Sequence, residues 1–322
     1  MIVVLDFGSQ YSQLIARKIR QLNVYTEIVP FNTTLAQIKK MKPQGIILSG
    51  GPASVYAENA PQLDKRVLEL GVPVLGICYG LQSIAHKLGG KVEHSEKREY
   101  GHADVMCDSK DPFWNGLGAK QKVWMSHGDK VVKLPKDFKA LGKTDTCPFA
   151  VVRHAKLPIY GVQFHPEVHH TVKGNDILRN FAVDVCGCAT DWRMHDFVEK
   201  TIADLREHVG DRRVVCAVSG GVDSTVMAVL LHRAIGDQLV PVFVDNGVLR
   251  KDEVQDVIER FNGLGIKIKL AKSGSRFLKQ LKGVSDPEKK RKIIGRTFIE
   301  VFFDYLKPTD FLAQGTLYPD VI

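Results

Sequence analysis

The chain has 322 residues, of which 44% are hydrophobic and 25% charged, and this composition is ordinary for a globular protein of about two domains. Its longest apolar runs are strand-sized, and Met1 leads directly into IVVLDFG, so we expect neither a membrane span nor a secretory signal. The net charge of +9 divides into +7 over residues 1–188 (24 Lys and Arg, 17 Asp and Glu) and +2 over 189–322 (21 and 19), which favours anionic metabolites over nucleic acid or a membrane as partners.

The first ninety residues alternate between strand and helix patterns. Leu14, Ile15, Ile19 and Leu22 recur with helical spacing, whereas short apolar runs between turns are typical of buried strands. Strands are expected at 2–8, 25–31, 45–52 and 72–78. Helices are expected at 10–22, 35–41, 61–70 and 81–88. This alternation predicts βαβ units around a parallel sheet.

Residues 91–165 contain shorter strand patterns among turns, which indicates a mixed-sheet extension that a helix at 175–187 closes. After a break at 187–193, the alternation resumes. Helices are expected at 195–209, 224–236, 252–265 and 286–306, and strands at 213–219, 239–245, 266–272 and 311–315. The sequence therefore predicts two three-layer α/β domains, at 1–188 and 193–322, each built on a mainly parallel sheet flanked by helices.

Cys78 lies in GICYG, where a strand gives way to a helix. A sharp strand–turn–helix elbow exposes a nucleophile at the sheet edge, and the flanking glycines relieve crowding. The dipole and free N–H groups of the following helix favour the thiolate. The N–H groups of Tyr79 and Gly51 are candidate oxyanion donors. A buried structural cysteine is the alternative reading of this motif taken alone.

His165 and Glu167 lie in YGVQFHPE, and they strengthen the catalytic reading of Cys78. The two-residue period of an extended segment places both side chains on one side, with Pro166 stiffening the chain. His165 is predicted to take the thiol proton, and Glu167 to orient the imidazole. A metal site that uses His169 is a weaker alternative.

The other five cysteines give no sign of disulfide bonds or of a zinc site. Cys186 and Cys188 form the only close pair and lack a partner pair, so metal binding there is disfavoured. With no secretion signal, scattered cysteines favour a reducing, cytoplasmic location.

A second motif, RVVCAVSGGVDST, combines a strand, a glycine turn and a helix start. Its glycines let the backbone approach a phosphate, and Ser219 and Ser224 add hydroxyl donors. The motif lacks the lysine of a Walker A loop, so transfer of a γ-phosphoryl group is disfavoured. Asp223 is instead a candidate ligand for a magnesium ion that bridges phosphate and protein. The alternative is a plain capped turn.

With both sites in view, the chain resembles the glutamine-hydrolysing GMP synthetase family over its whole length. GICYGLQ with HPE is similar to class I glutamine amidotransferases, and SGGVDST to the signature of ATP pyrophosphatases, which split ATP between the α- and β-phosphates. Four further strings narrow the resemblance: WMSHGD (124–129), VDNGVLR (244–250), DPEKKRKIIGRTFIEVF (286–302) and AQGTLYPDVI (313–322).

The resemblance implies a catalytic triad of Cys78, His165 and Glu167, with Gln82 holding the glutamine and Val244 lining an adenine pocket. It also implies an ATP-binding loop of Ser219, Gly220, Gly221, Val222, Asp223, Ser224 and Thr225. Ammonia from glutamine would aminate xanthosine monophosphate (XMP) that ATP has adenylated, giving GMP with release of AMP and pyrophosphate. ATP and Mg²⁺ are thus the expected substrate and cofactor.

Members of this family continue beyond a string such as YPDVI. The resemblance therefore implies that the pyrophosphatase domain is truncated here, and that a C-terminal dimerisation domain, which would make the full-length protein a homodimer, is absent.

Three other functions are alternatives to glutamine-dependent GMP synthesis. An RNA-thiolating enzyme would need catalytic cysteines in the second half, which has only Cys216 beyond the linker, and a non-catalytic relative should lack Cys78 or His165. Another glutamine-dependent ligase, such as one forming NAD, is the remaining alternative.

Overall fold

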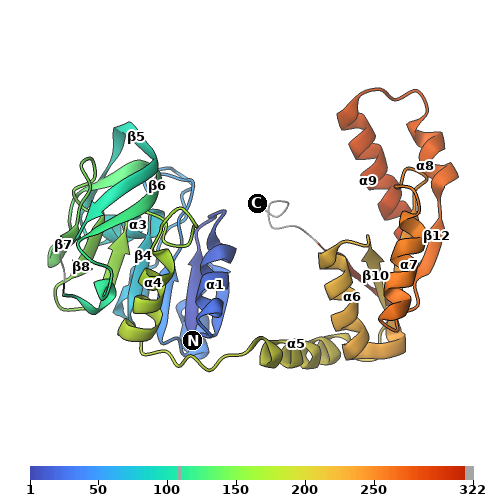
Figure 1. Ribbon diagram of the computed structural model, residues 1–322, viewed down its shortest axis with the longest axis horizontal. Helices are drawn as coiled ribbons and strands as arrows, with labels where there is room; N and C mark the ends of the chain where they lie inside the picture. Colours follow the sequence, from blue (N-terminus) through green and yellow to red (C-terminus); the bar gives the residue numbers. More distant parts are fainter. Residues whose placement is uncertain (108–109, 316–322) are drawn as a thin grey trace. The chain divides into compact units, whose positions relative to one another are not determined.

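A computed structural model of the chain describes residues 1–107 and 110–315 (Figure 1). The chain divides into two compact units, Met1–Trp192 and Arg193–Ile322. Each unit contains a sheet of mainly parallel strands with helices on both faces, so the predicted α/β fold class is confirmed. Residues 316–322, part of one string that carried the resemblance, lie outside the described residues.

The first unit is built on a seven-stranded sheet with strand order β2-β1-β3-β4-β9-β8-β7. The first five strands in this order pair in parallel, and the last two add an antiparallel edge. The strands are β1 (Ile2–Asp6), β2 (Thr26–Pro30), β3 (Gly45–Leu48), β4 (Val74–Ile77), β7 (Phe138–Gly142), β8 (Val151–His154) and β9 (Ile159–Val162).

Two long strands, β5 (Lys91–Met106) and β6 (Lys120–Lys133), form a separate antiparallel pair. The short 3₁₀ helix η2 (Pro112–Trp114) lies between them in sequence. The expected extension at 91–165 therefore forms two structures. β7 and β8 extend the main sheet, whereas β5 and β6 pair with each other, and Met106 at the end of β5 forms a single antiparallel bridge to Lys143 after β7.

Helices cover both faces of the seven-stranded sheet, because side chains along each strand point alternately to opposite faces. Ile2 and Val4 of β1 belong to a core cluster that contains residues of α1 and α4, whereas Val3 and Leu5 belong to a cluster with residues of α2 and α3. These helices are α1 (Ser12–Gln21), α2 (Leu35–Met41), α3 (Tyr79–Lys87) and α4 (Gly174–Arg179).

Two expected helices of this unit differ from the prediction. The pattern at 61–70 yields only the short 3₁₀ helix η1 (Lys65–Glu69), where the Asp64 carboxylate accepts from the N–H of Arg66. The closing helix is α4 for its first part and a π-helix, η3 (Asn180–Val185), for the rest. Its wider turn is visible in the bond from the N–H of Cys186 to the carbonyl of Phe181, five residues back.

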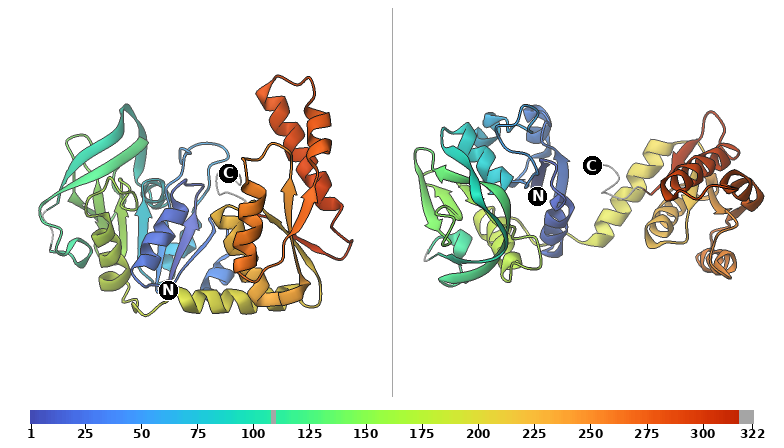
Figure 2. Two further views of the ribbon diagram at one scale, coloured as in Figure 1. Left: turned by 45° about the vertical axis from the view of Figure 1, so that its right-hand side comes forward. Right: turned by 90° about the horizontal axis from the view of Figure 1, so that it is seen from above.

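The second unit has a four-stranded parallel sheet in the order β12-β11-β10-β13 (Figure 2). Its strands are β10 (Val214–Val218), β11 (Leu239–Asp245), β12 (Lys269–Lys272) and β13 (Phe311–Ala313). One face packs against α5 (Met194–Val209), α6 (Val222–Ile235) and α7 (Glu253–Gly263), and the other against α8 (Gly274–Leu281) and α9 (Pro287–Phe303). A 3₁₀ turn, η4 (Gly236–Gln238), follows α6. The sequence did not predict α8, and none of the described helices could cross a membrane.

Both sheets bring the carboxyl ends of parallel strands to one edge, where ligands bind in open α/β folds. In the first unit these ends lead into Phe7 after β1, Ser49 after β3, Cys78 after β4 and Gln163 after β9. In the second unit, Ser219 follows β10 at the corresponding edge. The predicted site residues therefore lie where the fold favours a site.

Candidate active sites

Cys78 occupies a sharp turn between β4 and α3. Its backbone has φ 50° and ψ −102°, a left-handed conformation that L-residues rarely adopt and that is often found at functional sites. A methyl group added at Gly76 would lie 2.6 Å from the N atom of Leu81, and one at Gly80 would lie 2.4 Å from the carbonyl oxygen of Leu48. Both glycines are thus required for α3 to pack this closely against β4 and β3.

The thiol of Cys78 is nearly buried and lies among groups from three separate segments. The Cys78 N–H donates to the carbonyl of Val162 on β9 at 2.8 Å. Sγ lies 3.8 Å from the carbonyl oxygen of Ser126 on β6, and 3.7 Å from Nε2 of Gln163. The sulfur therefore lies at the edge of the core, within reach of one backbone carbonyl and one side-chain amide.

The imidazole of His165 is paired with the carboxylate of Glu167, Nδ1 lying 2.7 Å from Oε1, and both side chains are buried. The two residues lie in a turn after β9, not on the extended segment that the sequence predicted, because β9 ends at Val162. The carbonyl of Trp124 accepts from the N–H of His165, and the Thr171 hydroxyl donates to the His165 carbonyl, which fixes this turn.

The side chain of His165 also lies close to that of Cys78. A methyl group added at Gly50 would lie 3.1 Å from Cε1 of His165 and 3.9 Å from Cβ of Cys78, so the two side chains face the same small space. Burial alone lowers the pKa of His165, but the Glu167 carboxylate and a hydrogen bond with Cys78 raise it well above its usual value. The three predicted triad residues are thus brought together, and the protonated imidazole is favoured beside the sulfur.

The other predicted residues of this site lie close by. A methyl group added at Gly51 would lie 2.8 Å from the Phe7 carbonyl oxygen and 3.3 Å from Cγ of Tyr79, so Gly51 packs against the Phe7 backbone and the Tyr79 ring. The N–H of Tyr79 belongs to the first turn of α3, where amides have no intrahelical acceptor. Gln82 is buried, and its Nε2 donates to the carbonyl of Asp129 at 2.7 Å.

The contributions of β6 and of Gln163 could not be found from the residues alone. Ser126 and Asp129 are 48 and 47 residues from the groups that they contact on Cys78 and Gln82. The only sequence signal for them was WMSHGD, which contributed to the family resemblance without an assigned role. Gln163 stands in YGVQFHPE, but only His165 and Glu167 of that string have side chains typical of a triad.

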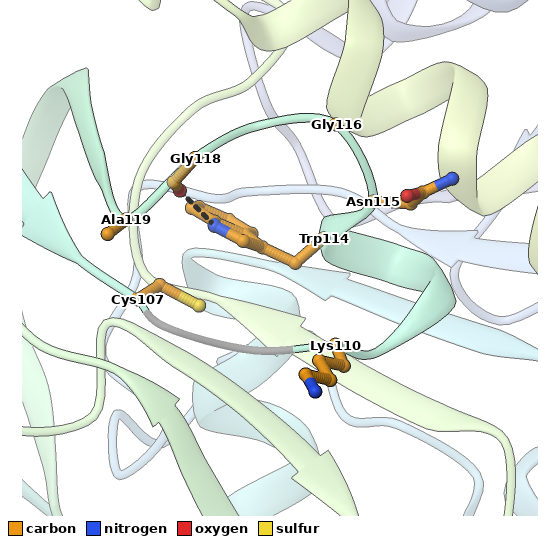
Figure 3. A pocket seen from close by; sticks show the side chains of 7 residues that line it. All are labelled: Cys107, Lys110, Trp114, Asn115, Gly116, Gly118 and Ala119. Carbon is orange, nitrogen blue, oxygen red and sulfur yellow. Dashed lines mark hydrogen bonds between the residues drawn. The ribbon is translucent and has the colours of Figure 1, made fainter.

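A cavity of about 310 Å³ in the first unit lies apart from these residues (Figure 3). Its lining residues are Cys107, Lys110, Trp114, Asn115, Gly116, Gly118 and Ala119. The Trp114 indole N–H donates to the Gly118 carbonyl at 3.0 Å, which closes the loop around it. None of the predicted site residues lines this cavity.

In the second unit, the predicted phosphate loop joins β10 to α6. Gly220 has φ 76°, and Gly221 is the N-cap of the helix. The hydroxyl of Ser224 is buried inside the loop: it accepts from the Ser219 N–H at 3.1 Å and donates to the Gly221 carbonyl at 3.1 Å. Ser224 therefore holds the loop in shape.

The outer side of this loop is open to solvent. Ser219, Gly221 and Asp223 are exposed, and Val222 is 78% exposed. The hydroxyl of Thr225 donates to the Gly221 carbonyl at 2.8 Å. The first amides of α6 lack intrahelical acceptors, so the loop presents N–H groups and the positive end of a helix dipole to an anion.

Helix α7 supports the loop from behind. Nη1 of Arg260 donates to the carbonyl of Gly220 at 2.6 Å, and a methyl group added at Gly220 would lie 2.5 Å from Cγ2 of Val257. Val244, expected near an adenine, lies one residue before the end of β11 and pairs with Ala271 of β12, and its side chain is buried in the core on the α8–α9 face.

Asp223 is the predicted metal ligand, and it lies exposed in the first turn of α6. Over residues 1–107 and 110–315, no group of three or more His, Cys, Asp and Glu side chains is placed to hold a metal ion. One carboxylate beside an anion-binding loop fits Mg²⁺ that is held mostly by phosphate and water, which is how this ion usually binds with nucleotides.

Comparisons with known proteins agree with the division of the chain into two units. Residues 3–185 match the family model described as glutamine amidotransferase class-I, and residues 193–296 match one described as NAD synthase. A solved structure from Thermoplasma acidophilum, described as that of a GMP synthase subunit, is 32% identical, with a TM-score of 0.51, and covers 62% of this chain and 96% of its own.

Two curated relatives match the whole chain. It is 54% identical over 324 residues to GMP synthase (glutamine-hydrolyzing) of Aquifex aeolicus (strain VF5), and 53% identical over 326 residues to that of Latilactobacillus sakei subsp. sakei (strain 23K). These matches confirm the resemblance that the motifs indicated. The chain spans 64% and 63% of the length of these two relatives.

Proposed function

Since the chain belongs to the class-I glutamine amidotransferase family, we propose that its first unit hydrolyses glutamine to supply ammonia for an ATP-dependent reaction in its second unit. The amidotransferase domain would be residues 1–188, and residues 193–322 would be part of an ATP pyrophosphatase domain. The observation that carries the proposal is the buried arrangement of Cys78, His165 and Glu167. It joins a nucleophile, a base and an orienting carboxylate, as acyl-transfer chemistry requires.

The sulfur of Cys78 attacks the side-chain amide carbon of glutamine, and the carbonyl oxygen becomes an oxyanion. His165 gives its proton to the departing nitrogen, which leaves as ammonia, and a thioester to Cys78 remains. Water, activated by the neutral imidazole, then attacks the thioester and releases glutamate and the thiol. The raised pKa of His165 supports this cycle, because a protonated imidazole can give its proton to the departing nitrogen.

The backbone N–H groups of Gly51 and Tyr79 would stabilise the oxyanion. Gly51 packs against the Tyr79 ring, and this contact supports the role by holding the turn after β3 beside the first residue of α3. Gln82, one turn into α3, would hold the bound glutamine. Its Nε2 is already bonded to the Asp129 carbonyl, so its amide is oriented before the substrate arrives.

In the second unit, ATP would place its β- and γ-phosphates against the loop of Ser219, Gly220, Gly221, Val222, Asp223, Ser224 and Thr225. The exposed face of this loop and the N-terminus of α6 support binding of an anion. Asp223 would hold Mg²⁺ through one carboxylate, and the ion would offset charge on the leaving pyrophosphate. Val244 would contribute to the adenine side of this site through the end of β11.

The nucleotide product follows from the relatives, which are named GMP synthase (glutamine-hydrolyzing). The C2 oxygen of XMP would attack the α-phosphate of ATP and displace pyrophosphate, and ammonia would then displace AMP to give GMP. The match of residues 193–296 to the NAD synthase model keeps a NAD-forming ligase as the second candidate. Identity of 54% along the whole chain favours GMP.

The test is to incubate the protein with glutamine, ATP, magnesium and XMP, and to measure glutamate, pyrophosphate and GMP separately. Glutamate that appears with wild type and not with Cys78→Ala supports the first step. Pyrophosphate that requires XMP supports the second. If deamido-NAD in place of XMP supports pyrophosphate release, the NAD-forming reaction is correct instead. We also propose a cytoplasmic location and a homodimer for the longer protein, which fractionation and light scattering would test.

A further inference from the structure

Gln163 lies beside the catalytic sulfur and takes no part in the triad. Its side chain is completely buried, and its Nε2 lies 3.7 Å from Sγ of Cys78. Its other side-chain atom, Oε1, has no hydrogen-bond partner among the described residues. A buried acceptor without a partner destabilises a fold. An apolar side chain of the same size would avoid that cost, so packing alone does not account for the amide.

The backbone holds this amide against the sulfur. The N–H of Gln163 donates to the carbonyl of Ala150 at 3.0 Å, and the carbonyl of the preceding residue, Val162, accepts from the N–H of Cys78 at 2.8 Å. The bond at Val162 therefore fixes the distance between the end of β9 and the turn at Cys78, and the bond at Gln163 holds the same segment against the residue before β8. The side chain of Gln163 has little freedom to move away.

Of the two polar groups beside the sulfur of Cys78, one favours its protonated form and the other favours its anion. The carbonyl of Ser126 at 3.8 Å can only accept, so it suits the neutral S–H. An amide N–H can only donate, so at Gln163 it suits the anion, because a hydrogen bond to a charged form favours that form. His165 faces the sulfur, Glu167 pairs with Nδ1 of that imidazole, and the Tyr11 ring lies 5.4 Å from the imidazole, centroid to centroid.

We propose that Gln163 is a further catalytic residue of this site, whose side-chain N–H stabilises the thiolate of Cys78 before it attacks. The inference rests on the proposed function, in which that sulfur is the nucleophile. His165 accepts the proton, and the amide of Gln163 then donates to the anion left behind. Because the site is buried, this neutral donor acts where water is scarce and the hydrogen bond is strong.

The experiment measures alkylation of Cys78 by iodoacetamide, read by mass spectrometry at pH 7 and pH 10, in wild type and in Gln163→Met. Methionine keeps the size of the side chain and removes both polar atoms. We expect the rate at pH 7 to fall about tenfold, the size of effect that loss of one hydrogen bond to an anion produces, with equal rates at pH 10. Gln163→Glu, which places a carboxylate beside the sulfur, should react more slowly still at pH 7.

Two further measurements separate chemistry from packing. In glutamine hydrolysis, kcat should fall in Gln163→Met while KM stays close to wild type, and Tm should not fall, because an unpaired acceptor has been removed. Gln121→Met is the matched control: this glutamine is also largely buried, but its Nε2 lies near Gly118. It should leave the alkylation rates unchanged.

Equal alkylation of wild type and both Gln163 variants at pH 7 would overturn the assignment. So would a fall at both pH values together with a lower Tm, because the amide would then support only the fold. If wild type releases no glutamate but Gln163→Met still slows alkylation of Cys78 at pH 7, the proposed function fails and the inference about the thiolate stands. If glutamate release depends on Cys78 but Gln163→Met does not slow alkylation at pH 7, the inference alone fails.

Discussion

Nδ1 of His165 lies 2.7 Å from Oε1 of Glu167, in a turn that buries both side chains. The pair is two residues apart in sequence, and its turn is held by the carbonyl of Trp124 and the hydroxyl of Thr171. Because Glu167 raises the pKa of His165, the pair affects both the proton transfers and the pH dependence of folding.

Glu167→Gln should lower glutamine hydrolysis by about a hundredfold or more, because the imidazole loses its orienting charge. It should also change stability with pH. The pKa of His165 is raised above its ordinary value of 6.5, so the folded state binds the proton more tightly than the unfolded state. The resulting stability is fully present below about pH 6.5 and is lost as pH rises through the higher folded pKa.

Measurement of Tm from pH 5 to pH 9 checks this second effect. Wild type should lose stability across the upper part of that range more steeply than Glu167→Gln. Parallel curves for the two proteins would show that the carboxylate does not hold the proton on the imidazole.

Cys78→Ala should lower glutamine-dependent glutamate release by about a thousandfold or more, because the attacking atom is gone. Any reaction that uses added ammonia should persist, because the second unit does not use this sulfur. The control is Cys147→Ala, which removes another buried thiol of the first unit. Glutamine-dependent product formation by Cys78→Ala would refute the assignment of the nucleophile.

Gly80→Ala tests the packing that shapes the elbow. The added methyl would lie 2.4 Å from the Leu48 carbonyl oxygen, a backbone atom, so α3 must move away from β3. We expect a loss of about 1–3 kcal/mol in the free energy of unfolding, with reduced glutamine hydrolysis. Tryptophan fluorescence reports the first unit, because Trp114, Trp124 and Trp192 all lie in it.

Gly295→Ala is the control for that experiment. This glycine is exposed in α9, has nothing within 4 Å of an added methyl, and belongs to the second unit. The substitution should leave the fluorescence transition unchanged and stabilise the second unit by about 0.5–1 kcal/mol, the usual gain in helix propensity. If Gly80→Ala and Gly295→Ala lowered the free energy of unfolding followed by fluorescence to the same extent, the contact with Leu48 would not be the cause of the loss.

Asp223→Asn should weaken binding of Mg·ATP about tenfold, because one charged contact to the ion is lost. When a chelator removes the magnesium, Asp223→Asn should bind ATP no more weakly than wild type, because without the ion the carboxylate of Asp223 only repels phosphate. Asp256→Asn, an exposed change on the neighbouring α7, is the control. Equal dissociation constants for wild type and Asp223→Asn in magnesium would remove Asp223 as the ligand.

Much of the first site could be predicted because its features are local. The elbow at Cys78 follows from a strand, two glycines and a helix in consecutive residues, and the pairing of His165 with Glu167 spans three. The environment of the sulfur could not be predicted in the same way. Ser126 reaches Cys78 from β6, and register between distant strands is decided by the packing of the whole sheet.

The differences in secondary structure have similar causes. Residues 61–70 have a helical pattern but form only η1, because Pro61 and the Asp64 cap shorten the segment that can be helical. Helix α8 has eight residues and was not predicted from the sequence; in the structure, Phe277 anchors it in the core. Val244 was placed by resemblance, and the structure adds that its side chain belongs to the core.

Arg260→Met tests the support that α7 gives to the phosphate loop. Nη1 of Arg260 donates to the Gly220 carbonyl at 2.6 Å, and Gly220 has the left-handed backbone that turns the loop toward α6. Loss of this bond should weaken binding of Mg·ATP by about 1 kcal/mol, which raises its dissociation constant about fivefold, as measured by calorimetry. Arg233→Met is the control, because this arginine of α6 pairs instead with Glu199.

Arg260 is a positioning residue if Arg260→Met binds ATP more weakly while its Tm is unchanged. Equal ATP binding by wild type, Arg260→Met and Arg233→Met would show that the loop keeps its shape without the bond from α7.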